Sequence, residues 1–256
     1  MTLMFLARRR TSAGGLFTDT DRAAGVFGVL GTSFAVVLAF VIFLAFESYG
    51  SAKDKAGVEA ISVSELFRES ALFSPQVHDA LQGELICYAR SVIDDEWPAM
   101  RRQRTSPLVD RWLANLDSTV ARAPITGDKQ AAEFSHWLDS AAARQDGRRG
   151  RLAEAPPFVP PPLWFLLLFG AILVIGYTVF FADSGERFLV QAMMIGTLTA
   201  IVVSSLLTIR FLDRPYENRS GSIKPVEMTR TLRLMEGAAR LPGPARCDLG
   251  GRPSPP

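Results

Sequence analysis

The sequence predicts an all-α integral membrane protein, with three transmembrane helices and a helical soluble domain between the first and the second. Three observations predict this fold class. Long apolar runs occupy residues 24–46, 163–182 and 188–212, the region between the first two runs has helical periodicity, and no stretch alternates as a strand does. Hydrophobic residues make up 48% of the 256 residues and charged residues 21%, which favours apolar blocks separated by water-soluble ones.

The first apolar run contains about 23 residues without a charge, enough at 1.5 Å per residue to cross a ~30 Å hydrocarbon core. Its small residues lie mostly three or four positions apart and form one narrow face, made of Gly25, Gly28, Gly31, Ala35 and Ala39. In lipid, such a face lets another helix backbone approach closely. The face therefore packs either on another span of the same chain or between subunits around a shared axis.

Residues 1–23 form an N-terminal basic segment ahead of this span. Met1–Ala7 is apolar and Arg8–Arg10 follows it, as at the end of a membrane helix and its anchor. Two helical turns cover only about 10 Å, which is too little to cross the bilayer. We expect that the true start lies upstream and supplies a fourth span. The alternative is a three-span protein whose first residues lie flat at the membrane surface.

Residues 47–162 are expected to form the helical soluble domain. Helical spacing continues past the first span, and serine followed by proline, a favoured helix start, occurs twice. The expected parts are one long helix to Phe73, helices that begin after Ser74 and Ser106, a helix over 128–152 and a stiff proline-rich connector at 156–162.

The helix that follows Ser74 is expected to break at Glu96-Trp97-Pro98, because a proline inside a helix removes one backbone hydrogen bond. Two interpretations of Glu96 are open. It is either an acid held in a kink or part of a purely structural break, and we favour the break.

The last two apolar runs, 163–182 and 188–212, are joined by a short turn, so they form an antiparallel pair. Asp213-Arg214-Pro215-Tyr216 follows the third span directly, where we expect it to serve in anchoring or subunit contact. The C-terminal tail, 213–256, is predicted to contain a short amphipathic helix over 225–240 and to be disordered from Leu241 onward.

The residues that usually carry catalysis are sparse. The chain has two histidines, His78 and His136, and neither lies near a serine, cysteine or acid in a familiar catalytic spacing. Cys87 and Cys247 lie far apart in unlike surroundings, so neither a disulfide nor a metal site is predicted. We therefore expect no enzyme, no cofactor and no metal. The net charge of +2, without a basic stretch interleaved with aromatics, gives no reason to expect nucleic acid as a partner.

Charge near the span ends predicts the topology. Lysines and arginines are more numerous on the domain side, at positions such as Lys53, Lys55, Arg148 and Arg214, than on the side of the turn at 183–187. Because positive residues favour the inside, we expect the helical domain and the C-terminal tail to face the cytoplasm from the plasma (inner) membrane.

The order of these features resembles the bacterial bestrophin-like family of membrane proteins. The resemblance covers residues 21 to about 235, and its sharpest motifs are Glu96-Trp97-Pro98 and Asp213-Arg214-Pro215-Tyr216. It implies four spans, one more than this sequence shows, and a distant relation to bestrophin anion channels. The family has no established catalytic or ligand residues to carry over.

The resemblance, with the long first helix and its small face, favours a homo-oligomeric channel-like pore in the lipid bilayer, with an anion as the conducted ion. Apolar rings can gate such a pore by dewetting. The candidate constriction residues are Phe34, Val41, Ile42 and Phe46. The alternative is a non-conducting membrane-anchored scaffold or sensor whose helical domain binds a protein partner.

Overall fold

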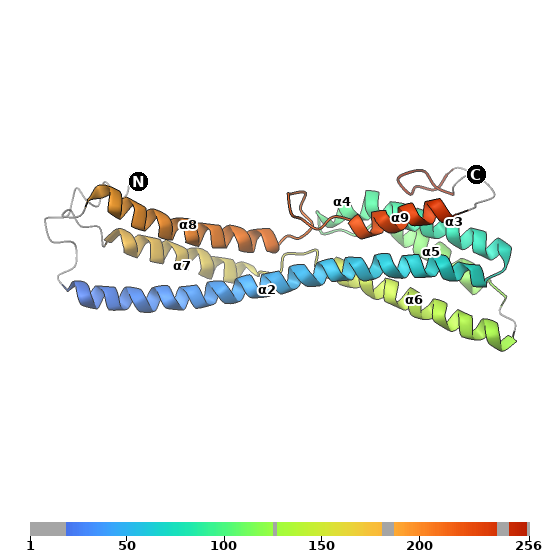
Figure 1. The fold of residues 1–256 in the computed structure, drawn as a ribbon, viewed down its shortest axis with the longest axis horizontal. Helices are drawn as coiled ribbons and strands as arrows, with labels where there is room; N and C mark the ends of the chain where they lie inside the picture. Colours follow the sequence, from blue (N-terminus) through green and yellow to red (C-terminus); the bar gives the residue numbers. More distant parts are fainter. Residues whose placement is uncertain (1–18, 125–126, 181–186, 240–245, 255–256) are drawn as a thin grey trace. The chain divides into compact units, whose positions relative to one another are not determined.

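The computed structural model of the protein describes residues 19–124, 127–180, 187–239 and 246–254 (Figure 1). In chain order its elements are α2 (Thr20–Glu69), the 3-10 helix η1 (Ser70–Leu72), α3 (Pro75–Ser91), the π-helix η2 (Val92–Glu96), α4 (Trp97–Met100), α5 (Pro107–Ala121), α6 (Gly127–Ala153), α7 (Pro161–Phe180), α8 (Phe188–Leu212) and α9 (Val226–Ala238). The described residues contain one isolated β-bridge and no strand, so the all-α prediction is confirmed.

The chain divides into two compact units. The first comprises residues 1–48 and 157–213, and the second comprises residues 49–156 and 214–256. Helix α2 is continuous from Thr20 to Glu69, so it contributes its first part to one unit and its second part to the other. This continuity confirms the expectation that the first span extends as one long helix.

The first unit holds the membrane spans. Within the described residues, α2, α7 and α8 are each long and apolar enough to cross a membrane, which confirms the three predicted spans. Their shared core is small, and consists of Leu38, Val41, Val159, Leu167 and Ile209. Most of their other apolar side chains are exposed, as for Phe165, Ile172 and Leu189. Exposed apolar side chains over the length of a span are what a lipid environment favours.

The second unit is a helical domain in which α5 and α9 pack against α3 (Figure 1). The predicted helix starts are confirmed: α3 and α5 both begin with proline, and the Ser106 hydroxyl accepts a hydrogen bond from the Val109 backbone N–H. The main buried side chains of its core are Leu81, Leu85, Tyr88 and Val92 of α3, Trp112 and Leu116 of α5, and Met228 and Met235 of α9.

Helix α6 approaches the second part of α2 closely through a glycine. An ideal Cβ on Gly147 would lie 2.6 Å from the Glu59 backbone nitrogen, so any side chain at this position would push the two helices apart. The close approach matters for the site below, because it places the polar side chains of α6 directly against α2.

The expectation of a disordered C-terminal tail is wrong for residues 246–254. Helix α9 and this last segment belong to the helical domain, and Cys247 forms a disulfide with Cys87 of α3. The sequence predicts no disulfide from these two cysteines, and the structure corrects this. The partners are 160 positions apart in sequence, and only the return of the chain over α3 brings their Cα atoms to 5.8 Å.

Two expectations fall outside the described residues. Met1–Arg10, on which the idea of an upstream span rests, is not described, and neither are residues 183–186 of the turn between α7 and α8.

Candidate functional site

The structure places the four predicted constriction residues in different surroundings. Val41 is 2% exposed and packs in the core of the first unit, while Phe34 and Ile42 are half-buried against the same core. The ring of Phe34 lies over Gly170 of α7, where an ideal Cβ would be 2.6 Å from Phe34 Cδ2. Phe46 alone of the four is exposed, at 60%. The structure therefore does not bring these residues together on one open face.

The predicted small face of α2 is open within the chain. No described atom outside the helix lies within 4 Å of an ideal Cβ on Gly25, Gly28 or Gly31, and Ala35 and Ala39 are exposed. The described helices of this chain thus leave the face uncovered, contrary to packing on another described span of the same chain.

The Glu96-Trp97-Pro98 motif lies at a local π-turn. Residues 92–96 form the π-helix η2, and the Trp97 backbone N–H donates to the Val92 carbonyl. The wider turn accommodates Pro98, which has no N–H and cannot continue the regular helical ladder. It also turns the Glu96 side chain into the interior of the domain, where the carboxylate is fully buried.

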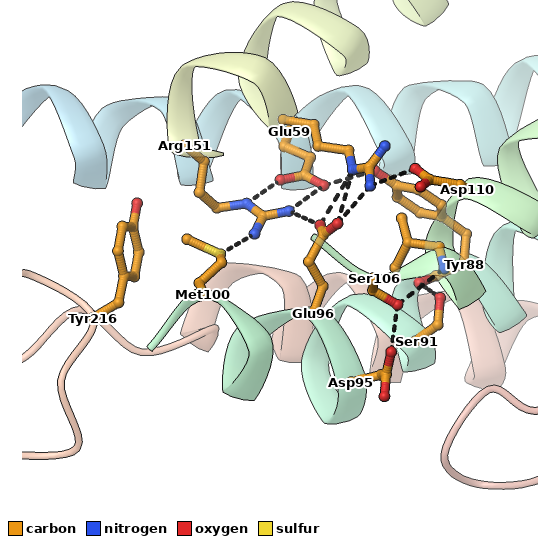
Figure 2. Close-up of polar contacts among 12 residues, drawn as sticks. Glu59, Tyr88, Ser91, Asp95, Glu96, Met100, Ser106, Asp110, Arg151 and Tyr216 are labelled. Atoms are coloured by element: carbon orange, nitrogen blue, oxygen red, sulfur yellow. Dashed lines mark hydrogen bonds and ion pairs between the residues drawn. The ribbon is translucent and has the colours of Figure 1, made fainter. Parts of the chain in front are cut away.

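Glu96 belongs to a buried cluster of four charged side chains, two acids and two arginines (Figure 2). Arg151 of α6 donates from Nη2 to Glu96 Oε2 at 2.6 Å and from Nε to Glu59 Oε2 of α2 at 2.5 Å. Arg148, one helical turn earlier, donates to Glu96 Oε1 at 2.5 Å and to Asp110 of α5 at 2.8 Å. The four side chains join α2, η2 and α6, and the exposed Asp110 links them to α5.

A tyrosine extends the cluster to α3. The Tyr88 hydroxyl donates to Glu59 Oε1 at 2.6 Å, and the guanidinium of Arg144 lies 5.4 Å from the centre of the Tyr88 ring. Burial raises the pKa of the Tyr88 hydroxyl well above its ordinary value, and the negative charge of Glu59 adds to the effect. Tyr88 is therefore a fixed hydrogen-bond donor at neutral pH.

The pKa of Glu96 moves the other way. Burial by itself would raise the pKa of this carboxyl, but the hydrogen bonds and positive charges of Arg148 and Arg151 outweigh burial and hold its pKa below the ordinary value. Glu96 is thus a permanent carboxylate near neutral pH. A general acid needs a pKa near the operating pH, so this cluster has the properties of an internal support rather than of a proton donor.

The Glu96-Trp97-Pro98 and Asp213-Arg214-Pro215-Tyr216 motifs meet in space. The rings of Trp97 and Tyr216 lie edge to face with centroids 5.6 Å apart, and the Arg151 guanidinium lies 4.9 Å from the centre of the Trp97 ring. The Tyr216 hydroxyl donates to the Ala52 carbonyl of α2 at 3.2 Å, and Trp97 Nε1 donates to the Ile223 carbonyl. The motifs therefore fix the polypeptide after Pro215 against η2, α4 and α2.

The charges at the start of the second motif have separate partners. Asp213 is buried, and its Oδ1 accepts a hydrogen bond from the Val159 backbone N–H at 2.7 Å. Arg214 is exposed and pairs with Glu217 at 3.0 Å.

Sequence reasoning missed Glu59, Arg148 and Arg151. A signal was present, because the two arginines lie three positions apart and so share one helix face, and Glu59 directly precedes the apolar position Ala60. The histidines do not join the cluster: His78 Nδ1 lies 3.0 Å from the Ser70 hydroxyl, and His136 is exposed. Among the described residues no group of three or more His, Cys, Asp or Glu side chains could hold a metal ion.

Comparison with known proteins identifies relatives of this arrangement. Residues 1–225 match the family model of the Bestrophin-like domain. No curated protein matches the chain in sequence.

Crystal structures of a bacterial bestrophin homologue from Klebsiella pneumoniae share the fold. The structure phased on zinc superimposes with a TM-score of 0.66 at 15% identity, and covers 92% of this chain and 95% of that one. A single-substitution variant gives a TM-score of 0.67 at 15% identity, with 92% and 96% covered. At such low identity, the similarity concerns the fold.

Proposed function

Since the chain belongs to the bestrophin-like family, we propose that it assembles into a homo-oligomeric channel-like pore in the bacterial inner membrane and that the pore conducts anions. Bestrophins are oligomeric anion channels, and the matched family model covers the spans and the part of the helical domain that precedes α9. The alternative, a non-conducting scaffold or sensor, becomes one outcome of the test below.

The observation that carries the proposal is the uncovered small face of α2. A span that exposes Gly25, Gly28, Ala35 and Ala39 offers close backbone approach and no bulky side chain for lipid to surround. Helices in lipid associate through such faces by close packing. In a homo-oligomer, a helix of a second copy of the chain would pack against this face.

Exposure narrows the choice of constriction residue to Phe46. Val41 packs inside the chain, whereas Phe46 lies seven positions beyond Ala39, about two turns along the same side of α2. A ring of phenylalanines, one from each subunit, is an apolar constriction of the kind that gates by dewetting. Phe46 therefore narrows the pore, and Phe34, Val41 and Ile42 support the packing of the spans.

We place the helical domain, including the C-terminal segment, in the cytoplasm. The excess of lysine and arginine on the domain side supports this orientation. Single cysteines introduced by Ser135→Cys in α6 and Ser184→Cys in the turn, in a chain that lacks the native cysteines, test it in intact cells. A membrane-impermeant thiol reagent should label the turn only. Labelling at position 135 alone would reverse the orientation.

Ion flux from liposomes tests the pore. Purified oligomer should release chloride or iodide down a gradient, and Phe46→Ala should increase the rate because it widens an apolar constriction. Phe40→Ala is the matched control, since Phe40 is similarly exposed, at 62% against 60%, on another side of the helix. Release of potassium without chloride would support a pore but contradict the proposal that it conducts anions. A folded oligomer that passes neither ion would favour the scaffold.

A further inference from the structure

The last described segment, residues 246–254, is fastened to the helical domain by the only two cysteines of the chain. We call this segment the C-terminal strap. Cys247 in the strap and Cys87 in α3 form the disulfide, and both are buried, at 3% and 1% exposed. The strap has no helix of its own, and its internal backbone bonds run from Asp248 N–H to the Arg252 carbonyl, from Gly251 N–H to the Asp248 carbonyl and from Ser254 N–H to the Arg246 carbonyl.

The rest of the attachment is polar and lies over α3 and α5. Trp112 Nε1 donates to the Gly251 carbonyl at 2.7 Å, and Arg90 Nη1 donates to the Asp248 carbonyl at 3.1 Å. Gly251 has a φ of +78°, and an ideal Cβ there would lie 2.6 Å from the Ser91 backbone nitrogen. The strap thus lies close against α3 at a glycine, where no other residue fits.

A short irregular segment loses much conformational freedom when it docks, and a few hydrogen bonds exchanged with water offset that loss only in part. The covalent link therefore decides how long the strap stays in place. With the disulfide closed, the strap cannot leave α3. With two thiols, the remaining contacts have to hold it unaided.

The difference between the disulfide and dithiol forms matters because we place the helical domain in the cytoplasm. Disulfides are rare in the reducing cytoplasm, and those that form there are usually transient or redox-sensing. We propose that Cys87 and Cys247 are a reversible redox pair that locks the strap onto α3 when a small-molecule disulfide oxidises it. The inference rests on the cytoplasmic placement of the domain and not on ion conduction.

The exchange has two balanced steps. With the strap released, the Cys247 thiolate attacks one sulfur of the small disulfide, forms a mixed disulfide and expels one small thiolate. As the strap docks, the Cys87 thiol gives its proton to solvent and attacks the Cys247 sulfur, which expels the second small thiolate. The two cysteines lose two electrons, and the small disulfide gains them as two thiols.

The structure favours Cys247 as the residue that reacts first. Both cysteines lie in the hydrophobic core when the strap is docked, but Cys247 is in the segment that can leave, whereas Cys87 is fixed on α3. In the docked strap Arg90 Nη1 is 3.9 Å from Cys247 Sγ, and this cation stabilises Cys247 as the leaving thiolate when the disulfide is reduced. The same guanidinium binds Glu236 of α9 at 2.7 Å, so it is held in position whether or not the strap is docked.

Hydrogen exchange of the full chain in detergent tests the lock. In the oxidised protein the Asp248 and Ser254 amides should be protected. Reduction, or Cys247→Ser, should raise their exchange at least tenfold and leave amides of α9 unchanged. Trp112→Phe removes one strap contact without touching sulfur, so it should speed exchange in the reduced protein and not in the oxidised one. Equal protection of the strap in both redox states would overturn the proposal.

Thiol trapping in intact cells tests the redox state itself. Cells quenched in acid and alkylated should contain mainly the dithiol form, and a brief pulse of a permeant thiol oxidant should convert it to the disulfide. A chain that is fully disulfide-bonded before the pulse would overturn the redox pair and would show a permanent cross-link in an oxidising compartment. That result would also contradict the cytoplasmic placement, while chloride flux from liposomes would still test the pore separately.

Discussion

The rings of Tyr216 and Trp97 lie edge to face with centroids 5.6 Å apart, and this contact joins the two motifs that lie at distant points of the sequence. Tyr216→Phe keeps the ring and removes the hydroxyl that donates to the Ala52 carbonyl, so it should destabilise the helical domain by about 1 kcal/mol. Tyr216→Ala also removes the ring contact and leaves a cavity, which should cost about 3–5 kcal/mol. Chemical denaturation in detergent measures both changes.

The control for Tyr216 is Tyr49→Phe. The Tyr49 hydroxyl donates to the Gly221 carbonyl at 2.7 Å, but at an exposed position, where water replaces the bond. Tyr49→Phe should therefore lower the stability of the helical domain less than Tyr216→Phe does. Equal losses would mean that the second motif has no special place in the domain.

Substitution of Arg151 tests whether the buried charged cluster is essential for stability, because this side chain is fully buried between two acids. Arg151→Met keeps an unbranched apolar stem and removes the guanidinium, which leaves Glu59 and Glu96 without their shared cation and should cost about 3–5 kcal/mol or abolish folding. Arg149→Met, at an exposed neighbouring position, is the matched control and should change stability little. Similar yields and melting temperatures for the two variants would contradict an essential cluster.

Glu96 gives a pH dependence with a definite sign. Because its pKa is lower in the folded protein than in the unfolded chain, it stabilises the fold above the unfolded-state pKa, and this contribution is lost as pH falls through the folded-state pKa. Glu96→Gln should therefore lower the melting temperature at pH 7 and flatten its decline under acid conditions. Glu227→Gln, at an exposed position on α9, should keep the steep decline.

The secondary-structure elements could be predicted because their signals are local. The N-caps at Ser74 and Ser106 and the apolar runs of the spans each depend on residues that are close in sequence. The pairing of Cys87 with Cys247 could not be predicted, because it exists only after the strap returns to α3. The pairing of Arg151 with Glu59 could not be predicted for the same reason. Helical periodicity shows that a side chain points into the core, but it does not identify the residue that the side chain contacts there.

The second motif shows the limit of reading neighbours in sequence. Adjacent opposite charges at Asp213 and Arg214 suggest a pair, yet Asp213 accepts from the Val159 N–H and Arg214 pairs with Glu217. Asp213→Ala leaves a buried N–H without its acceptor and should cost about 1–3 kcal/mol, while Arg214→Ala removes an exposed ion pair worth about 0–1 kcal/mol. Yield and oligomer size on a sizing column compare the two. A larger loss for Arg214→Ala would restore the paired interpretation.

The contact between Gly170 and Phe34 tests how α7 packs on α2. An ideal Cβ on Gly170 would lie 2.6 Å from Phe34 Cδ2 and 2.8 Å from Cε2, so Gly170→Ala must displace the ring. It should lower the melting temperature of the protein in detergent, whereas Gly176→Ala on the same helix, with no described atom within 4 Å, should not.

The double variant makes the test specific to this pair. Phe34→Ala removes the ring that Gly170→Ala would strike, so the second substitution should cost less in its presence, with a coupling free energy of about 0.5–3 kcal/mol. A cycle of four melting experiments supplies this coupling. If the two losses simply add, then the ring of Phe34 does not lie over Gly170 in the membrane, and the two helices meet along a different line.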